Sequence, residues 1–364
     1  MRIILIHIFF LLIACLSNNI QAQNKLTDDL KISLGLHYGF NLPEYQMFTY
    51  ITNNYIHSVD VSIIKETSGK NEWEQIFNYP EYGLSLFYSS LGNDDIFGRE
   101  FSVNPFFRTN IIYKENFKLY NQIGVGLSYV NKKFNAEDNY LNVAVGSNIN
   151  LHFNLRFGIN YSFYNRFAIN SGISFDHFSN ANTSEPNLGI NYITAFTGLS
   201  YRIGQKTTKK KTILSPHIKE NYFNIVANIG GKYSRALSSK KYVTASISFE
   251  AKRKCYKVFH LGIGADIFYD NSVEDQLLDA GKEYKSIDSF QTGFHFSQTV
   301  IYNKLSLSLE EGLYIGLVEK VEEYHIYNRG IISYQINKKL SIRLAMKSHL
   351  HILDYPEFGL AYKL

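Results

Sequence analysis

The sequence predicts an all-β protein, a transmembrane antiparallel β-barrel of about 12–16 strands with a polar or plugged lumen. Three observations support this fold class: an apolar N-terminal run typical of exported proteins, segments in which apolar and polar residues alternate strictly, and a content of 28 tyrosines and 27 phenylalanines. No stretch after residue 16 is long and apolar enough for a helical span. Membrane insertion must therefore use strands.

The N-terminus predicts a secretory signal peptide over residues 1–22. Arg2 precedes an apolar run from Ile3 to Ala14, and a polar stretch then leads to Ala22, after which we expect cleavage. The run is too short for a transmembrane anchor, which needs about 20 apolar residues. Lipidation of Cys15, which follows small and apolar residues, is the alternative.

Residues 23–364 are interpreted as one domain, because no linker rich in Pro, Gly or Ser divides them. Only Cys255 remains after signal cleavage, so an intrachain disulfide is excluded. The formal net charge is +5, with a lysine-rich run at 206–211. This run lacks the interleaved aromatic residues of a nucleic-acid site and is interpreted as a solvated periplasmic turn.

Strict alternation identifies the strands. From Leu151 to Phe163 every odd residue is apolar, and the even positions between them hold His, Asn, Arg, Gly or Ser. This is a strand with one apolar and one polar face. Similar patterns occur in Phe117–Tyr129, Phe223–Ile229, Leu261–Tyr269, Leu305–Leu317 and Leu340–Met346.

The connections fall into two kinds, as expected when short periplasmic turns alternate with longer outer loops. The tight turns are predicted at Lys114–Asn116, Asn165–Arg166, Asn303–Lys304 and Asn337–Lys339. The long polar loops are predicted at Asn131–Tyr140, Asn180–Asn187 and Asp270–Ser286. The final residues alternate up to Leu364, which predicts that the C-terminus ends the last membrane strand.

One hairpin carries a chemical motif. His177-Phe178-Ser179-Asn180-Ala181 is followed by a short loop, by Pro186-Asn187-Leu188-Gly189, and by Asn191. This segment resembles the active-site hairpin of the outer-membrane lipid A 3-O-deacylases, the PagL family. A weaker likeness to the Bacteroidetes acyloxyacyl hydrolases extends from Tyr82 to Tyr201. The deacylase-like portion is thus about 80–204, with additional strands over 215–364, whereas compact family members have about eight strands.

The residues themselves support nucleophilic chemistry. His177 and Ser179 lie two apart on one strand and therefore share a face with Ile173 and Phe175, which predicts that they point outward toward lipid. A polar pair is costly there unless the substrate itself lies in the membrane. A hydroxyl with an adjacent base suits acyl transfer, with Ser179 as nucleophile and His177 as general base and then general acid.

The resemblance implies the remaining roles. It places Asn191 where the family has an acidic residue that orients the histidine, and Asn180, Asn182, Asn187 and Gly189 in the loop that stabilises the oxyanion. Loop amides near Asn180 and Asn182 can also donate to such an oxyanion. An asparagine can orient an imidazole but supplies no charge. Glu185 in the loop is the alternative acid, whereas Asp176 faces the opposite side of the strand.

Two other interpretations compete with these assignments. The hairpin motif could be ordinary turn chemistry, since Asn, Pro and Gly are common turn residues. His349, His351, Asp354 and Glu357 could in principle bind a metal, but their place near the terminal strand is typical of loop and interfacial residues. We therefore expect no metal and no cofactor.

The sequence as a whole predicts a carboxylic ester hydrolase of the outer membrane. By the resemblance, it removes the 3-O-linked hydroxyacyl chain of lipid A through Ser179 and His177, at a site facing the lipid. The expected partner is lipid A or lipopolysaccharide of the outer leaflet, and a homodimer is possible. The alternative is a catalytically silent barrel of the same family, acting as a pore, a structural protein or an adhesin.

Overall fold

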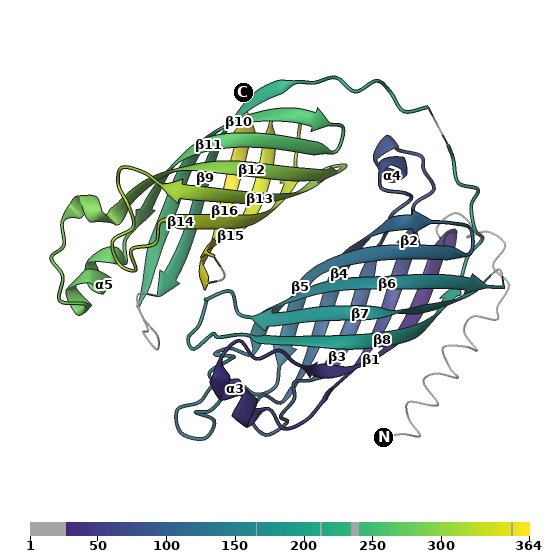
Figure 1. Cartoon of the computed structure of the whole chain (residues 1–364), viewed down its shortest axis with the longest axis horizontal. Helices are drawn as coiled ribbons and strands as arrows, with labels where there is room; N and C mark the ends of the chain where they lie inside the picture. The colour runs from purple at the N-terminus through teal and green to yellow at the C-terminus, as the bar shows by residue number, and fades with distance from the viewer. Residues whose placement is uncertain (1–26, 165, 212, 234–239, 351) are drawn as a thin grey trace.

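The computed structural model describes residues 27–364 except 165, 212, 234–239 and 351. The predicted signal peptide and Cys15 lie outside these residues. Sixteen antiparallel strands close into two barrels of eight, drawn as two separate cylinders in Figure 1. Among the described helices, none has the length and apolar content of a membrane span.

The first barrel holds the motif hairpin. Its strands are β1 (Leu30–Asn41), β2 (Ile56–Glu66), β3 (Glu81–Ser90), β4 (Arg99–Tyr113), β5 (Phe117–Val130), β6 (Ile149–Phe163), β7 (Phe167–Ser179) and β8 (Ile190–Arg202). β1 pairs with β8 from Lys31↔Arg202 to Asn41↔Tyr192, and this pairing closes the barrel. Two short helices lie in its connections, α3 (Gln46–Ile51) and α4 (Glu72–Ile76).

The second barrel follows after residues 203–220. Its strands are β9 (Asn221–Tyr233), β10 (Lys241–Tyr256), β11 (Phe259–Asp270), β12 (Phe290–Tyr302), β13 (Leu305–Tyr314), β14 (Ile326–Gln335), β15 (Leu340–His349) and β16 (Ile352–Lys363). It closes where β16 pairs with β9. The loop between β11 and β12 carries α5 (Val273–Asp279) and the 3-10 turn η1 (Ser286–Ser289).

The strand number lies at the upper end of the predicted range, but the interpretation as one barrel is wrong. Eight strands already form a closed sheet, because the first and last strands of each set pair with each other. The lysine-rich run, interpreted as a turn, lies in the segment between the barrels. Lys209 Nζ donates to the carbonyl of Thr67 at 2.7 Å, so this segment packs against the first barrel.

Alternation places polar side chains in each lumen and apolar ones outside. On β6, His152, Asn154 and Arg156 are buried, whereas Leu155 and Phe157 are 42% and 46% exposed. Buried charges must be paired to be tolerated. In the first lumen Lys118 Nζ lies 2.5 Å from a Glu81 carboxylate oxygen, so the lumen is filled by ion pairs.

The outer mouth of the first barrel is closed by an apolar cluster. It gathers residues from several loops and strand ends: Phe48, Ile56, Phe87, Leu91, Phe97, Val130, Ala144, Val145, Phe178, Ile190 and Tyr192. Phe178 and Ile190 belong to the motif hairpin, and both are buried. The cluster therefore anchors the hairpin from the inside.

Candidate active site

The C-terminal end of β7 presents His177 and Ser179 on the outward face of the barrel. Their neighbours Asp176 and Phe178 point inward and are fully buried, whereas Ile173, on the same face as His177, is 53% exposed. His177 is half-buried, and Ser179 is 9% exposed where the β7–β8 loop begins. The period-two rule thus places both motif residues on one face, as the sequence predicted.

Strand pairing supplies the third member. In the register of β7 with β8, His177 lies directly opposite Asn191. The Asn191 Oδ1 atom is 2.6 Å from His177 Nδ1, and His177 Nε2 is 3.2 Å from Ser179 Oγ. Because an amide oxygen can only accept, Nδ1 must carry the proton, and Nε2 is left free to accept from the Ser179 hydroxyl. The three side chains form a connected Ser-His-Asn series.

A carboxylate contacts Asn191, the last member of this series. Glu44, in the β1–β2 loop, accepts a hydrogen bond from Asn191 Nδ2 at 3.5 Å. The contact arises because β1 pairs with β8 at the barrel seam, which brings Asn41 opposite Tyr192. Sequence reasoning missed Glu44, since no local pattern joins residues 147 positions apart.

The β7–β8 loop is held by its own asparagines. The Asn180 amide N–H donates to Asn187 Oδ1 at 2.8 Å, and Asn180 Oδ1 accepts from the Thr183 amide at 3.0 Å. The Asn180 side chain is therefore engaged within the loop. The Asn187 carboxamide is oriented by its oxygen, which leaves its Nδ2 group as the donor. Ala181 and Asn182 both have positive φ, 55° and 59°.

Gly189 is required by backbone and by space. Its φ is +75°, and a Cβ built there would lie 2.9 Å from His177 Cε1 and 3.1 Å from the Phe178 carbonyl oxygen. L-residues rarely adopt this φ, and a contact below 3.0 Å forces the imidazole to move. The glycine of the motif thus shapes the space in which His177 sits.

The structure does not bring the alternative acid to the histidine. Glu185 lies within the loop, where burial raises the pKa of its carboxyl. His177 Nδ1 contacts Asn191 instead. Asp176 faces the lumen, as predicted, and its carboxylate lies 2.8 Å from His152 Nε2.

Asn182 reaches the second barrel. Its Nδ2 donates to the main-chain oxygen of Asp354, on β16, at 3.0 Å. A side chain that the sequence places in the oxyanion loop thus has a partner in the second barrel. Its backbone N–H remains the group that could serve an oxyanion.

The possible metal ligands near the terminal strand have other partners. His349 Nε2 is 3.0 Å from the Tyr314 hydroxyl, and Asp354 pairs with Lys232 at 2.7 Å and with Lys347 at 2.8 Å. His351 lies outside the described residues. Another group of donors, Glu250, His295 and Glu310, converges in the second lumen. Its two carboxylates are bridged by Arg343, at 3.3 and 2.9 Å, so a guanidinium occupies the position a cation would take.

Comparison with known families divides the chain in the same way as the two barrels. A lipid A 3-O-deacylase (PagL) model matches residues 57–200. A model described as the C-terminal domain of acyloxyacyl hydrolase matches residues 221–364. A search of curated proteins finds no match.

Solved barrels give distant similarities. The outer membrane enzyme PagL is 15% identical, covers 46% of this chain and 97% of its own, and has a TM-score of 0.33. Neisserial surface protein A is 8% identical, with 48% and 97% coverage and a TM-score of 0.34. A porin of Rhodopseudomonas blastica is 6% identical over 92% of this chain and 99% of its own, with a TM-score of 0.17. At these scores the family assignment depends on the sequence models.

Proposed function

We propose that this chain, which belongs to the PagL family, is a lipid A deacylase. Residues 57–200 match the lipid A 3-O-deacylase (PagL) model, and residues 221–364 match the model of the acyloxyacyl hydrolase C-terminal domain. The chain is an integral β-barrel protein of the outer membrane. Its proposed activity is hydrolysis of the 3-O-linked hydroxyacyl ester of lipid A by Ser179 and His177, at a site that faces the lipid.

The observation that carries this proposal is the Ser179–His177–Asn191 series. Its two contacts, 3.2 and 2.6 Å, are of hydrogen-bond length, and they lie on the outward face at the end of β7 where the loop begins. A base within reach of a hydroxyl, oriented by a third group, is the arrangement that nucleophilic catalysis requires. A substrate held in the outer leaflet can reach such a site without leaving the membrane.

The acylation step follows from these positions. Ser179 Oγ attacks the ester carbonyl carbon, and its proton passes to His177 Nε2. The oxyanion that forms is stabilised by the Asn187 Nδ2 group and by the Asn182 backbone N–H. When the tetrahedral intermediate collapses, the C–O bond to the sugar breaks, and His177 returns the proton to the departing 3-hydroxyl. An acyl-Ser179 ester remains.

Deacylation follows the same proton path with water. His177 Nε2 takes a proton from a water molecule as its oxygen attacks the acyl carbon. The bond between the acyl carbon and Ser179 Oγ then breaks, His177 returns the proton to Oγ, and the hydroxy fatty acid leaves. Throughout, Asn191 Oδ1 holds the Nδ1 proton and thereby fixes the tautomer. Glu44, which accepts a hydrogen bond from Asn191 Nδ2 at 3.5 Å, partly compensates the imidazolium charge through this amide.

The experiment that tests this function is mass spectrometry of lipid A from cells that express the protein. We expect the loss of one hydroxyacyl mass with the wild type and no loss with Ser179→Ala or His177→Ala. Ser171→Ala, a half-buried serine of β7 on the same face, and His57→Ala, an exposed histidine of β2, are the matched controls and should retain activity. All variants must show the same outer-membrane insertion.

An unchanged lipid A profile in the wild type, with the native lipid also offered, would contradict the proposal. It would favour a silent barrel instead. Loss of activity in the Ser171→Ala control as well would indicate a folding defect in β7, so the controls separate chemistry from structure.

A further inference from the structure

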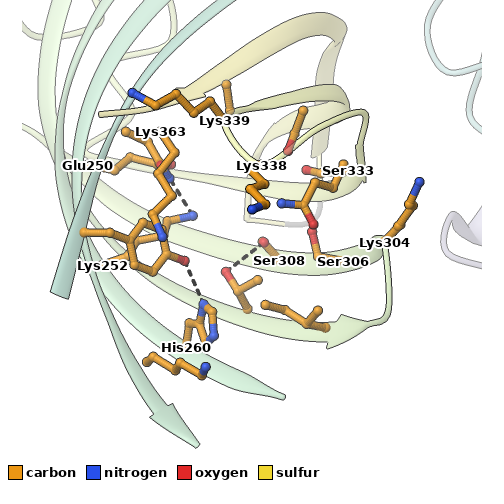
Figure 2. Close-up of a pocket in the computed structure, with 18 of the residues that line it drawn as sticks. Glu250, Lys252, His260, Lys304, Ser306, Ser308, Ser333, Lys338, Lys339 and Lys363 are labelled. Atoms are coloured by element: carbon orange, nitrogen blue, oxygen red, sulfur yellow. Dashed lines mark hydrogen bonds and ion pairs between the residues drawn. The ribbon is translucent and has the colours of Figure 1, made fainter. Parts of the chain in front are cut away.

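The second barrel holds a basic cavity at the end opposite to its long loops. It has a volume of about 310 Å³ and is open at the mouth formed by the turns at 257–258, 303–304 and 336–339 (Figure 2). Short turns and both barrel termini lie at this end, which is the periplasmic side of such a barrel. We call this cavity the basic vestibule; its defining residues are Lys252, Lys254, His260, Lys304, Lys338 and Lys363.

Positive charge in the basic vestibule exceeds the negative charge available to it. Eight lysines and arginines line it, against two glutamates. Of these cations, Lys363 pairs with Glu220 at 3.1 Å, and Lys257 pairs at 2.8 Å with Glu72, which lies outside the lining. Glu250 is already engaged by Lys252 at 3.1 Å and by Arg343 at 3.3 Å. Within the part of the chain that the structure describes, no ion pair involves Lys254, Lys304 or Lys338. Like charges brought together in a partly enclosed space repel one another, and a bound anion relieves that repulsion.

A buried ring nitrogen without a partner also points to a ligand. His260 is 8% exposed, and its Nδ1 lies 2.7 Å from the Tyr222 hydroxyl. Its Nε2 is buried and has no hydrogen-bond partner among the described residues. Leaving such a group unpaired is unfavourable. Figure 2 shows His260 and the hydroxyls of Ser306 and Ser308 on the wall of the same cavity.

The vestibule is a blind site. Directly above it, Arg343 bridges Glu250 and Glu310, and Arg329 lies 2.8 Å from Glu310, so paired side chains fill the lumen. A ligand can enter from the periplasm but cannot pass through. Its wall of lysines and hydroxyls offers point charges and several donors, which suit an anionic group with three or four oxygens. Ile301 and Ala361 are the aliphatic side chains in the lining, so polar side chains predominate.

We propose that the basic vestibule binds an anionic phosphoryl group from the periplasmic side. The volume lies at the low end of the roughly 300–1,000 Å³ of small-molecule sites, enough for a phosphorylated headgroup or a small soluble phosphate compound. The two sources share this chemistry: an anionic phospholipid of the inner leaflet presents its headgroup, or a soluble phosphate ester diffuses in. This inference is independent of the proposed esterase, because the basic vestibule and the site of Ser179 and His177 have no residue in common.

The test uses the full-length protein in nanodiscs and measures binding, not lipid A hydrolysis. In phosphatidylcholine nanodiscs, isothermal titration calorimetry with pyrophosphate probes the soluble source. In nanodiscs of mixed phosphatidylcholine and phosphatidylglycerol, native mass spectrometry of the released protein probes retained anionic lipid. The variant is Lys304→Gln with Lys338→Gln, two exposed turn residues whose replacement leaves the strands intact.

The matched control is Lys282→Gln with Lys285→Gln, which removes the same charge from the opposite end of the same barrel. We expect the vestibule variant to lose about tenfold or more in pyrophosphate affinity or in retained phosphatidylglycerol, and the control to stay within about twofold of wild type. His260→Gln should weaken binding in the same assay.

The two assay arms identify the source. Pyrophosphate binding that the vestibule variant loses assigns a soluble ligand, and phosphatidylglycerol retention that it loses assigns a headgroup. The proposal is overturned if the wild type shows neither, or if vestibule variant and control weaken equally, because the attraction would then be a property of net charge alone.

Discussion

At the scale of single residues, the amide of Asn191 decides how the proposed base is held. Its Oδ1 can only accept, so it selects the productive tautomer of His177. We expect Asn191→Ala to lower kcat for lipid A hydrolysis by about 10²-fold or more, because mis-set tautomers in such triads cost up to about 10⁴-fold. Asn191→Asp restores both the acceptor and a charge and should retain or raise kcat, measured as the rate of hydroxy fatty acid release.

Glu44 provides the comparison for that prediction. It meets Asn191 only through the amide nitrogen at 3.5 Å, so Glu44→Gln should cost no more than a few-fold in kcat. If Asn191→Ala were as active as wild type, the imidazole would not depend on this amide, and the proposed orientation of His177 would be wrong.

Gly189 allows strain and clash to be separated. Gly189→Ala combines a φ of +75° with a Cβ 2.9 Å from His177, whereas Gly281→Ala meets a similar φ of +69° with nothing within 4 Å. Both should lower the free energy of unfolding by about 1 kcal/mol, as urea titration would measure. Only Gly189→Ala should also reduce kcat, by about tenfold to a hundredfold, since it displaces the imidazole. Equal kcat in both variants would contradict the role given to Gly189.

The relative positions of the candidate site residues were partly predictable from the sequence. Alternation alone places His177 and Ser179 on one face, and a short hairpin loop brings Asn191 opposite. Glu44 depends on which strand closes the barrel, a long-range pairing that leaves no local periodicity. For the same reason the inward partner of Asp176, His152 on β6, could not be read from the chain.

At the scale of the hairpin, the β7–β8 loop is the element that would hold the oxyanion. Asn187→Asp keeps the oxygen that accepts the Asn180 N–H at 2.8 Å but replaces the Nδ2 donor by a second oxygen. We expect kcat to fall by about 10²–10³-fold, the usual cost of one oxyanion donor, with KM little changed. Steady-state kinetics on a soluble ester and on lipid A would measure it.

The free energy of unfolding of Asn187→Asp should stay near that of wild type, because the loop contact is retained. A large loss of stability together with kcat would indicate that Asn187 acts through loop structure and not as a donor. Asn187→Ala removes both Oδ1 and Nδ2. We expect it to lower kcat and the stability of the loop together, in contrast to Asn187→Asp.

Strand elements were predicted well where alternation is strict, as in β5 and β6, and less well where it fades. The strand predicted over Leu305–Leu317 is too long, since β13 ends at Tyr314. It ends there because Gly316 has a φ of +84° and turns the chain. Residues 56–66 form a full strand, β2, which is not among the alternating segments identified from the sequence. Its inward positions hold Asp60 and Ser62, which belong to the lumen network.

At the scale of the whole molecule, the number of barrels depends on closure and not on strand pattern. Sixteen alternating strands fit one wide barrel or two narrow ones equally well in sequence. Closure after β8 is set by the pairing of Gly35 with Gly198 and its neighbours on β1 and β8, a contact between residues 163 positions apart. The lysine-rich run at 206–211, which lies between the barrels, was the only break in composition, and it was interpreted as a turn.

Two barrels of eight strands also predict that the molecule does not conduct ions. A barrel of eight strands is just wide enough for its own side chains, whereas one of sixteen leaves a water channel. Arg156 with Asp60 at 3.2 Å fills the first lumen, and Arg329 with Asp266 at 2.5 Å fills the second. Each of these four charges is neutralised by its partner, so opening a path would leave them unpaired at a cost of several kcal/mol.

We therefore expect no unitary conductance from the purified protein in planar bilayers at neutral pH, under conditions in which a sixteen-stranded porin gives steady steps. Insertion is verified in parallel by protease protection of the β5–β6 loop in vesicles. Stable ohmic steps from inserted protein would contradict the two sealed lumens and revive the single-pore interpretation. A silent trace from inserted protein is what two lumens filled by paired side chains predict, because no continuous path of water then crosses either barrel.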